Sequence, residues 1–338
     1  MRITVLLGGT SSERDVSIAS GLRIAQALRS RGHEVRSVDT VNGPLSEQDE
    51  QRLVKTPVVK RTPPTREELA AMARGALDRL ARILPKPEDT DVVFLALHGG
   101  SGEDGTLQAL LDLAGLRYTG SGHLGSAIAM DKDLSKQLFV EAGVRTAEWL
   151  MAPATPERVA QTIGFPAIVK PSREGSTVGL SLVRSPDALD AAIAMAAEYD
   201  RAVMIEQYIP GREFTVGVLG AGALPVGEII PKHEIYDYEC KYTPGMADER
   251  FPAELSTAQV ERLQEQALRA FKALRLSGYA RIDFRMTDDG ETYCLEANTL
   301  PGMTDTSLIP QGAAAAGISF PDLCERIARL ALTDGAAR

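Results

Sequence analysis

Cysteine and tryptophan are scarce in this 338-residue sequence, which holds three Cys and one Trp. The thiols, at Cys240, Cys294 and Cys324, show no C-x-x-C spacing, which argues against a disulfide framework and against a zinc site. No stretch approaches the roughly 18 consecutive apolar residues that a membrane span requires. The opening apolar run is too short and too lightly charged for a signal peptide. We therefore expect a soluble, cytoplasmic protein with reduced thiols.

Basic residues are fewer than acidic ones: the sequence has 37 Lys and Arg and 46 Asp and Glu, which gives a net charge of −9. No dense Lys/Arg block offers a basic track to a phosphodiester backbone, so nucleic acid is not an expected partner. Single hydrophobic cores stop growing at roughly 250–300 residues, so a chain of this length indicates two or three domains.

The first part of the chain alternates between strand and helix patterns. The apolar run Ile3–Leu7 precedes a helical pattern that ends at Gly32, and Val35–Val38 and Val92–Leu97 resemble further strands. Strand, helix, strand predicts the α/β class with an open parallel sheet.

Three further features of the first 142 residues bear on where the helices begin and end. Ser12 with Asp15 has the S-x-x-D form of a capping box at the start of the first helix. We expect an irregular connection over Asn42–Lys60, a helix within Thr65–Leu84, and one continuous helix over Leu124–Ala142.

The remainder is rich in paired β-type runs with few helices between them, which points to antiparallel sheets. These runs are Phe165–Lys170, Gly179–Val183, Phe214–Leu219, Tyr279–Met286 and Thr292–Ala297. We expect domains at residues 1–120, 121–206 and 207–338.

The last two runs form a predicted hairpin that carries chemistry. If it folds about Asp288-Asp289 through a simple even-length turn, Arg281 and Asp283 share one face with Glu296 and Asn298. Two carboxylates and an amide oxygen suit Mg²⁺, which fills its remaining positions with water and phosphate oxygens. Periodicity alone supports equally well a solvated face where acidic and basic residues alternate.

The segment Lys170–Gly179 (KPSREGSTVG) is a loop of small residues that follows a strand. Backbone N–H groups of such a loop can surround phosphate oxygens. It is not a Walker A motif, because G-x-x-x-x-G-K-[ST] is absent. Taken alone, a surface loop explains it better.

A second glycine pattern, Gly100–Gly105, matches G-x-G-x-x-G. A dinucleotide site is disfavoured there because Glu103 and Asp104 would oppose the pyrophosphate. His98, just ahead, is on its own more often a structural hydrogen-bonding residue than a catalyst. Glu13, near a helix N-terminus, is equally explained by the helix dipole.

Taken together, segments across almost the whole chain resemble the D-alanine–D-alanine ligase family of the ATP-grasp superfamily. They are LGGTSSERDVS (7–17), ALHG (96–99), GEDGTLQ (102–108), YTGSG (118–122), MDK (130–132), VKPSREGSTVG (169–179), YDYECKY (236–242) and LEANTLPGMT (295–304). The resemblance implies the ATP-grasp fold: three α/β domains, the first with a Rossmann-like open parallel sheet and the last two closing on ATP.

By this resemblance several residues would hold ATP, with the loop Ser172–Val178 folding over the phosphates. They are Lys132, Lys170, Ser176, Glu206, Gln207, Tyr208, Ile209 and Glu213. Asp283, Glu296 and Asn298 would bind two Mg²⁺ or Mn²⁺ ions, in agreement with the hairpin face.

The resemblance also implies residues for two D-alanines. Glu13 would meet the first ammonium beside Ser176 and Tyr242, with His98 nearby, and Lys241, Ser307 and Leu308 would hold the second carboxylate. Arg281 and the N–H of Gly302 would stabilise the tetrahedral oxyanion. The expected reaction passes through a D-alanyl phosphate and releases ADP and phosphate for peptidoglycan synthesis.

Three alternatives remain open on the sequence. A sister ligase would make D-alanyl-D-lactate or D-alanyl-D-serine, although Tyr242 stands where the lactate branch looks to have histidine. The others are a nicotinamide-dependent oxidoreductase and a non-catalytic nucleotide-binding protein. The family resemblance further implies a homodimer.

Overall fold

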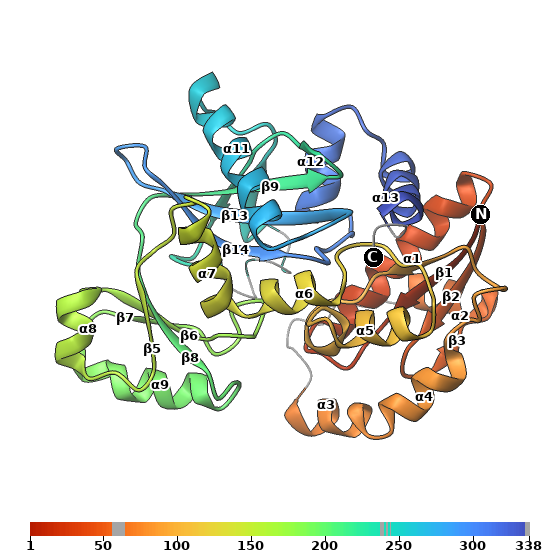
Figure 1. Cartoon of the computed structure of the whole chain (residues 1–338), viewed down its shortest axis with the longest axis horizontal. Helices are drawn as coiled ribbons and strands as arrows, with labels where there is room; N and C mark the ends of the chain where they lie inside the picture. The colour runs from red at the N-terminus through yellow and green to blue at the C-terminus, as the bar shows by residue number, and fades with distance from the viewer. Residues whose placement is uncertain (56–64, 237–239, 241–242, 244, 335–338) are drawn as a thin grey trace.

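The computed structural model describes residues 1–55, 65–236, 240, 243 and 245–334. The described residues form three β-sheets with helices packed around them, seen side by side in Figure 1. The predicted α/β class is confirmed. Within these residues no helix combines the length and the apolar character that crossing a bilayer needs.

The N-terminal sheet has the order β3-β2-β1-β4. Strand β1 (Arg2–Leu7) lies between β2 (Glu34–Asp39) and β4 (Val92–Leu95) and is parallel to both, while the two-residue β3 (Gly43–Pro44) is antiparallel to β2. Such sheets are buried on both faces, which explains the continuous apolar runs seen in the sequence.

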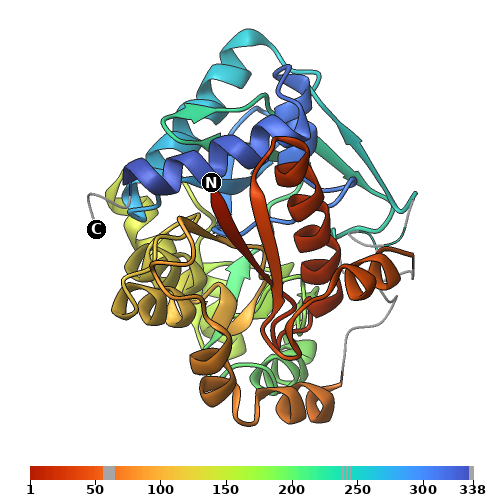
Figure 2. The ribbon, with the colours of Figure 1, turned by 90° about the vertical axis from the view of Figure 1, so that its right-hand side faces the viewer.

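Two helices far apart in the sequence cover this sheet together. Helix α1 (Arg14–Ser30) packs beside α13 (Phe320–Asp334), the last helix of the chain, as Figure 2 shows. Leu323 and Ile327 of α13 share one core with the strands of the N-terminal sheet. The C-terminal helix therefore completes the N-terminal core.

The predicted capping box at Ser12 and Asp15 is wrong. The N-cap of α1 is Glu13, one residue later, and its side chain makes no capping hydrogen bond. Its carboxylate instead accepts a hydrogen bond from Ser176, far away in the sequence. A tertiary contact has taken the place of a local one.

The described residues between 42 and 84, which are 42–55 and 65–84, are more regular than predicted. Helix α2 (Glu47–Lys55) lies in the stretch expected to be irregular. The helix expected over 65–84 is two helices, α3 (Arg66–Ala73) and α4 (Ala76–Ile83), because Gly75 adopts a left-handed φ of 66°. The next helix is α5 (Thr106–Leu113), preceded by the 3₁₀ turn η1 (Gly100–Gly102).

The continuous helix expected over 124–142 is also two helices, α6 (His123–Met130) and α7 (Lys132–Glu141). Asp131 separates them with φ −83° and ψ 97°, and its carboxylate accepts from the N–H of Leu134 at 3.2 Å. An aspartate at this position is a favourable N-cap, which the apolar periodicity conceals. The break places Lys132 at the start of α7.

The central sheet is antiparallel, with the order β5-β8-β6-β7. It consists of β5 (Trp149–Met151), β8 (Val203–Gln207), β6 (Ala167–Pro171) and β7 (Ser181–Val183), with α8 (Pro156–Thr162), η2 (Pro186–Ala188) and α9 (Leu189–Ala197) beside it. The β-type runs predicted at 165–170 and 179–183 pair as an antiparallel hairpin, with Ala167 opposite Val183.

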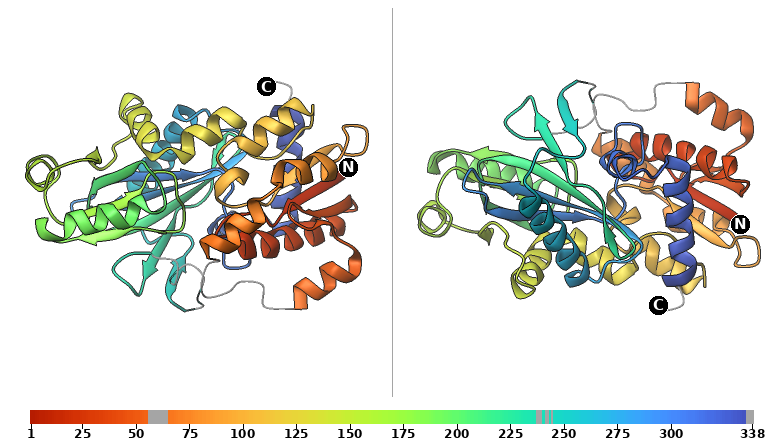
Figure 3. Two further views of the ribbon diagram at one scale, coloured as in Figure 1. Left: turned by 90° about the horizontal axis from the view of Figure 1, so that it is seen from below. Right: turned by 90° about the horizontal axis from the view of Figure 1, so that it is seen from above.

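The C-terminal sheet is antiparallel, with the order β12-β11-β9-β13-β14 and a short β10 beside β9. Its strands are β9 (Arg212–Leu219), β10 (Gly222–Ala223), β11 (Gly227–Pro231), β12 (Ala247–Arg250), β13 (Tyr279–Met286) and β14 (Thr292–Asn298). Helix α11 (Thr257–Ala273) packs on one face, and α12 (Leu308–Ala315) contacts β9. The two views of Figure 3 show this sheet between the central sheet and the N-terminal sheet, each with its helices; these three parts are called the C-terminal, central and N-terminal units below.

In the β13–β14 hairpin the predicted residues share one face, but the turn and the register that bring them together differ from the prediction. Asp283 lies opposite Glu296 and Arg281 opposite Asn298, as predicted. The turn, however, pairs Met286 with Thr292, and a register shift after Asp283 corrects the pairing. Leu295 is the extra residue of this bulge, because Phe284 pairs with Cys294. Without the bulge, Glu296 and Asn298 would turn away from Asp283.

Candidate active site

Two adjoining cavities lie where the three sheets meet. The first, about 110 Å³, opens between the N-terminal sheet and the C-terminal hairpin, and the second, about 130 Å³, lies between the central and C-terminal sheets. Both are lined by the same side chains at their junction: Lys132, Glu174, Ser176, Tyr236, Arg281 and Glu296. A group transferred from one cavity to the other would pass these residues.

The second cavity gathers the residues expected to hold ATP. Lys132, Lys170, Ser176, Glu206, Gln207, Tyr208, Ile209 and Glu213 all line it. Arg285 donates to the backbone oxygen of Ile209 at 3.1 Å and to the Glu213 carboxylate at 3.2 Å, which fixes the far end of this wall.

The hairpin face, which carries Arg281, Asp283, Glu296 and Asn298, lies at the junction of the two cavities. Arg281 binds Asp283 through two nitrogens, with Nε to Oδ1 at 2.9 Å and Nη2 to Oδ2 at 2.8 Å. Thr215 of β9 donates to the same carboxylate at 2.8 Å, and Asn298 Nδ2 at 3.0 Å. Burial lowers the pKa of the Arg281 guanidinium, but Asp283 more than offsets this and the pKa is raised. The arginine is therefore a permanent cation here.

The donor set of this face fits a hard divalent cation. Asp283, Glu296 and Asn298 supply oxygens from adjacent strands, and the carboxyamide of Asn298 can turn its oxygen outward, since the two amide ends are interchangeable in shape. Among the described residues no group of three or more His, Cys, Asp or Glu could hold a metal ion by itself. Two carboxylates with one amide suit an ion that takes its other ligands from phosphate and water.

Lysines lie around the same face. Lys132 Nζ lies 3.2 Å from Glu296 Oε2 and donates to the Glu174 backbone oxygen at 2.8 Å. Lys170 Nζ donates to Glu206 Oε2 at 2.6 Å. These ammonium groups give the second cavity positive charge opposite the hairpin.

In the first cavity, Ser176 donates a 2.6 Å hydrogen bond to Glu13. Ser176 and Thr177 have left-handed φ values of 51° and 58°, which are rare for residues with a side chain. Such strain is typical of binding loops held by their surroundings. The loop from the central sheet is thereby joined to the N-terminal unit.

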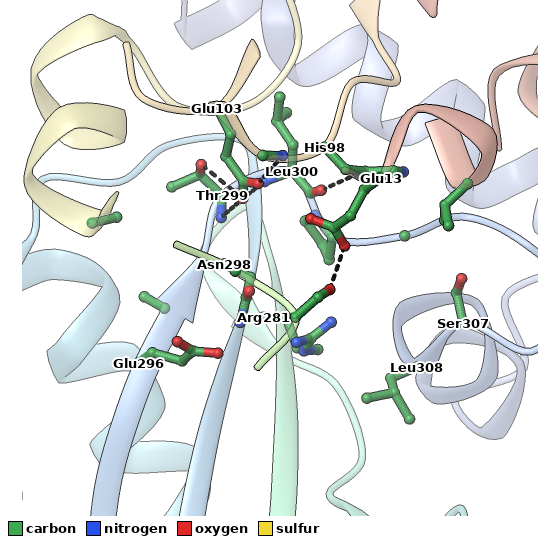
Figure 4. Close-up of a pocket in the computed structure, with 18 of the residues that line it drawn as sticks. Glu13, His98, Glu103, Arg281, Glu296, Asn298, Thr299, Leu300, Ser307 and Leu308 are labelled. Atoms are coloured by element: carbon green, nitrogen blue, oxygen red, sulfur yellow. Dashed lines mark hydrogen bonds between the residues drawn. The ribbon is translucent and has the colours of Figure 1, made fainter. Parts of the chain in front are cut away.

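The end of β14 is fastened to the N-terminal unit by His98 and Glu103 (Figure 4). His98 Nδ1 lies 2.7 Å from the backbone oxygen of Leu300, and Glu103 accepts from the N–H groups of Thr299 and Leu300 at 3.1 and 3.0 Å. Burial raises the pKa of the Glu103 carboxyl, and the charge of Glu13 adds to this. The glycine pattern around Glu103 thus serves a contact between units.

Gly302, Ser307 and Leu308 line the opposite wall of the first cavity. A Cβ on Gly302 would lie 2.8 Å from Ser307 Oγ, so the backbone approaches closely here. Ser307 is the N-cap of α12, and its Oγ accepts from the N–H of Thr304 at 2.9 Å. Lys241 and Tyr242, also expected in the site, lie outside the described residues.

Two residues that the sequence analysis assigned no role also belong to this region. Lys136 follows Lys132 by four positions, on the same face of α7, and that spacing could have identified it. Tyr236 lines both cavities and donates to Glu249 at 3.0 Å. Tyr236 is the first residue of the YDYECKY motif (236–242), and that position could have identified it.

Comparisons with known proteins agree with this arrangement. Family models described as D-ala D-ala ligase N-terminus and D-ala D-ala ligase C-terminus match residues 2–121 and 132–329. The chain belongs to the D-alanine–D-alanine ligase family. The resemblance seen in the sequence is confirmed.

Relatives in this ligase family match nearly end to end. The D-alanine–D-alanine ligase of Geobacter sulfurreducens is 41% identical over 329 residues, covering 96% of this chain and 92% of the relative. That of Syntrophobacter fumaroxidans is 42% identical over 343 residues, covering 99% and 98%.

Solved structures of the ligase family share the fold. A Bacillus anthracis D-alanine–D-alanine ligase complexed with ATP matches with a TM-score of 0.77 at 31% identity, covering 100% of this chain and 99% of that one. A Coxiella burnetii D-alanine–D-alanine ligase matches with a TM-score of 0.80 at 27% identity, covering 100% and 95%. The expected ATP-grasp architecture is thereby confirmed.

Proposed function

We propose that this protein joins two D-alanines to D-alanyl-D-alanine at the cost of ATP, releasing ADP and phosphate, for peptidoglycan precursor synthesis. The observation that carries the proposal is the pair of adjoining cavities that meet at Lys132, Ser176, Arg281 and Glu296. Phosphoryl transfer needs the phosphate donor in one compartment and the acceptor carboxylate in the next, with cations between them. The family membership of the chain supports the same chemistry.

The second cavity would hold ATP. Its wall from Glu206 to Ile209 would contact adenine, Glu213 the ribose, and Lys132 and Lys170 the phosphates. The loop Ser172–Val178 would cover the phosphates. Positioning and neutralisation of charge are what this transfer demands of a protein.

Asp283, Glu296 and Asn298 would hold Mg²⁺ or Mn²⁺, as two ions, against the phosphates. When bound, the ions would neutralise charge on the transferring phosphoryl group. Arg281 lies beside these ligands and remains a cation, so it would stabilise the oxyanion together with the Gly302 N–H.

The first cavity would hold the amino acids. Glu13 supplies a negative charge for the first ammonium, and the Ser176 hydroxyl stands beside it. His98 lines the same wall. Ser307 and Leu308, with Lys241 and Tyr242, would shape the place of the second D-alanine. Its amine would attack the D-alanyl phosphate, which closed walls protect from water.

We further propose three units, 1–120, 121–206 and 207–338, and a cytoplasmic homodimer. In support of a dimer, Leu113 of α5 and Leu124 of α6 are 88% and 47% exposed on adjoining helices. Light scattering would give twice the chain mass if this is right and the chain mass if it is wrong.

An assay of ADP release with D-alanine as sole amino acid tests the activity, with the dipeptide identified by mass spectrometry. D-alanine should drive ADP release and yield D-alanyl-D-alanine. A preference for D-lactate or D-serine as second substrate would instead favour a sister ligase. NADH binding without ATP binding in calorimetry would favour an oxidoreductase. The contacts of Glu103 argue against that alternative, because its carboxylate accepts hydrogen bonds from the N–H groups of Thr299 and Leu300.

A further inference from the structure

One buried and one partly buried lysine share one carboxylate beside the second cavity. Lys136 Nζ of α7 donates to Glu206 Oε1 at 2.6 Å, and Lys170 Nζ of β6 donates to Glu206 Oε2 at 2.6 Å. Among the described residues these two ammonium groups and one carboxylate form a cluster with an excess positive charge. Burial opposes ionisation of Glu206, but the two lysines more than offset it and hold its pKa at about 2.

The two lysines are not equivalent. The Lys136 side chain is 1% exposed, and it is not among the described residues that line either cavity. It is also fixed by Thr146 Oγ1 at 2.5 Å and lies over the ring of Trp149 at 5.2 Å. The Lys170 side chain is 12% exposed and lines the second cavity. Lys136 is therefore anchored, whereas Lys170 can reach a ligand.

This difference determines what Lys170 can do. To meet a phosphate, the Lys170 ammonium must give up part of its interaction with Glu206. If Glu206 had no other cation, that step would leave a buried, uncompensated carboxylate, which is unfavourable. With Lys136 in place, the carboxylate keeps a charged partner.

We propose that Lys136 is a positioning residue for the nucleotide: it holds the Glu206 carboxylate permanently and so frees Lys170 to exchange that carboxylate for a nucleotide phosphate. The inference rests on the proposed nucleotide site in the second cavity. It assigns the buried lysine to phosphate binding through Lys170 and gives it no contact with the nucleotide.

The test is the affinity of the full-length protein for ATP and for adenosine, measured by calorimetry in Lys136→Met. Methionine has similar length and no charge. ATP affinity should fall by about tenfold or more, because Lys170 is then neutralised by Glu206, while adenosine affinity stays unchanged. Thr146→Val, which removes the other hydrogen-bond partner of Lys136 and keeps its charge, should change ATP affinity by less than about threefold.

A second pair of variants tests the same coupling in a background where Lys136 has no carboxylate to hold. In a Glu206→Gln background there is no carboxylate for Lys136 to hold, so adding Lys136→Met should leave ATP affinity unchanged. An equal loss in that background, an equal loss for adenosine, or unchanged ATP affinity in Lys136→Met would each overturn the proposal.

The nucleotide site itself is checked in the same titrations. If Lys170→Met binds ATP as tightly as the unaltered protein, the assignment of the second cavity to the phosphates fails. A weakened Lys170→Met beside an unaffected Lys136→Met would refute the role of Lys136 alone.

Discussion

Ser176 and Glu13 lie 163 residues apart in the sequence and are joined by a 2.6 Å hydrogen bond across the first cavity. The bond connects the strained loop of the central unit to the first helix of the N-terminal unit. It therefore links closure of the loop to the residue proposed to receive the first ammonium.

Ser176→Ala removes this link and should raise KM for the first D-alanine about tenfold, since hydrogen bonds to charged groups contribute about 1.5–3 kcal/mol. Initial rates over a range of D-alanine concentrations give the value. Ser101→Ala, on an exposed turn outside both cavities, is the matched control and should leave KM unchanged. Equal KM values for the two variants would contradict the role given to the bond.

Glu296→Gln should keep the fold and lower turnover by about a hundredfold or more, because it removes a charged oxygen from the proposed metal ligands. ADP release at saturating Mg²⁺, with thermal unfolding as the test of folding, measures both effects. Glu291→Gln is the control: it lies on the same hairpin, pairs with Arg145, and lines neither cavity. Near-normal turnover in Glu296→Gln would refute the metal assignment.

The buried carboxylate of Glu206 predicts an acid dependence of stability. Its pKa falls from 4.5 to about 2 in the folded protein, where Lys136 and Lys170 outweigh the cost of burial. The resulting stabilisation, on the order of 3 kcal/mol, is fully present above the unfolded pKa and is lost as pH falls toward the folded pKa.

Urea unfolding of the unaltered protein and of Glu206→Gln, from pH 7 down to pH 2.5, measures this dependence. The difference in unfolding free energy should be constant above about pH 5 and shrink below about pH 4.5. A difference that does not change with pH would mean that Glu206 is not held ionised by its lysines.

Helix α1 contains a glycine whose replacement should destabilise the protein, against the usual helix preference for alanine. A Cβ on Gly21 would lie 2.6 Å from Leu7 Cβ of strand β1. Gly21→Ala should therefore cost about 1–3 kcal/mol of unfolding free energy through overpacking. Gln26→Ala, on the exposed face of the same helix, should be neutral or slightly stabilising. Stabilisation by Gly21→Ala would disprove the close packing.

The strand positions could be predicted because their apolar runs are long and bounded by turn residues. The helix breaks at Asp131 and Gly75 could not, since one side chain that caps a helix or one glycine that turns it leaves the apolar periodicity intact. The facing of Asp283 and Glu296 was predicted correctly from a wrong turn. The bulge at Leu295 supplies the missing residue, and no pattern in the sequence marks it.

The residues of the candidate site could be predicted from the sequence, but the contacts between them could not. The family resemblance gave most of the residues assigned to the two cavities, but spacing did not predict that Glu206 is shared by Lys136 and Lys170, because those groups come from α7, β6 and β8. Contacts between separate units are fixed by the packing of whole elements. Local sequence patterns therefore do not predict contacts between units.

The most direct test is the anomalous X-ray signal from a crystal of the protein grown with ADP and Mn²⁺ in place of Mg²⁺. The proposed metal site predicts a manganese peak at coordination distance, about 2.0–2.3 Å, from oxygens of Asp283, Glu296 and Asn298, with the ADP phosphates on its other side and beside Lys170. Manganese and nucleotide bound away from the β13–β14 hairpin would contradict it.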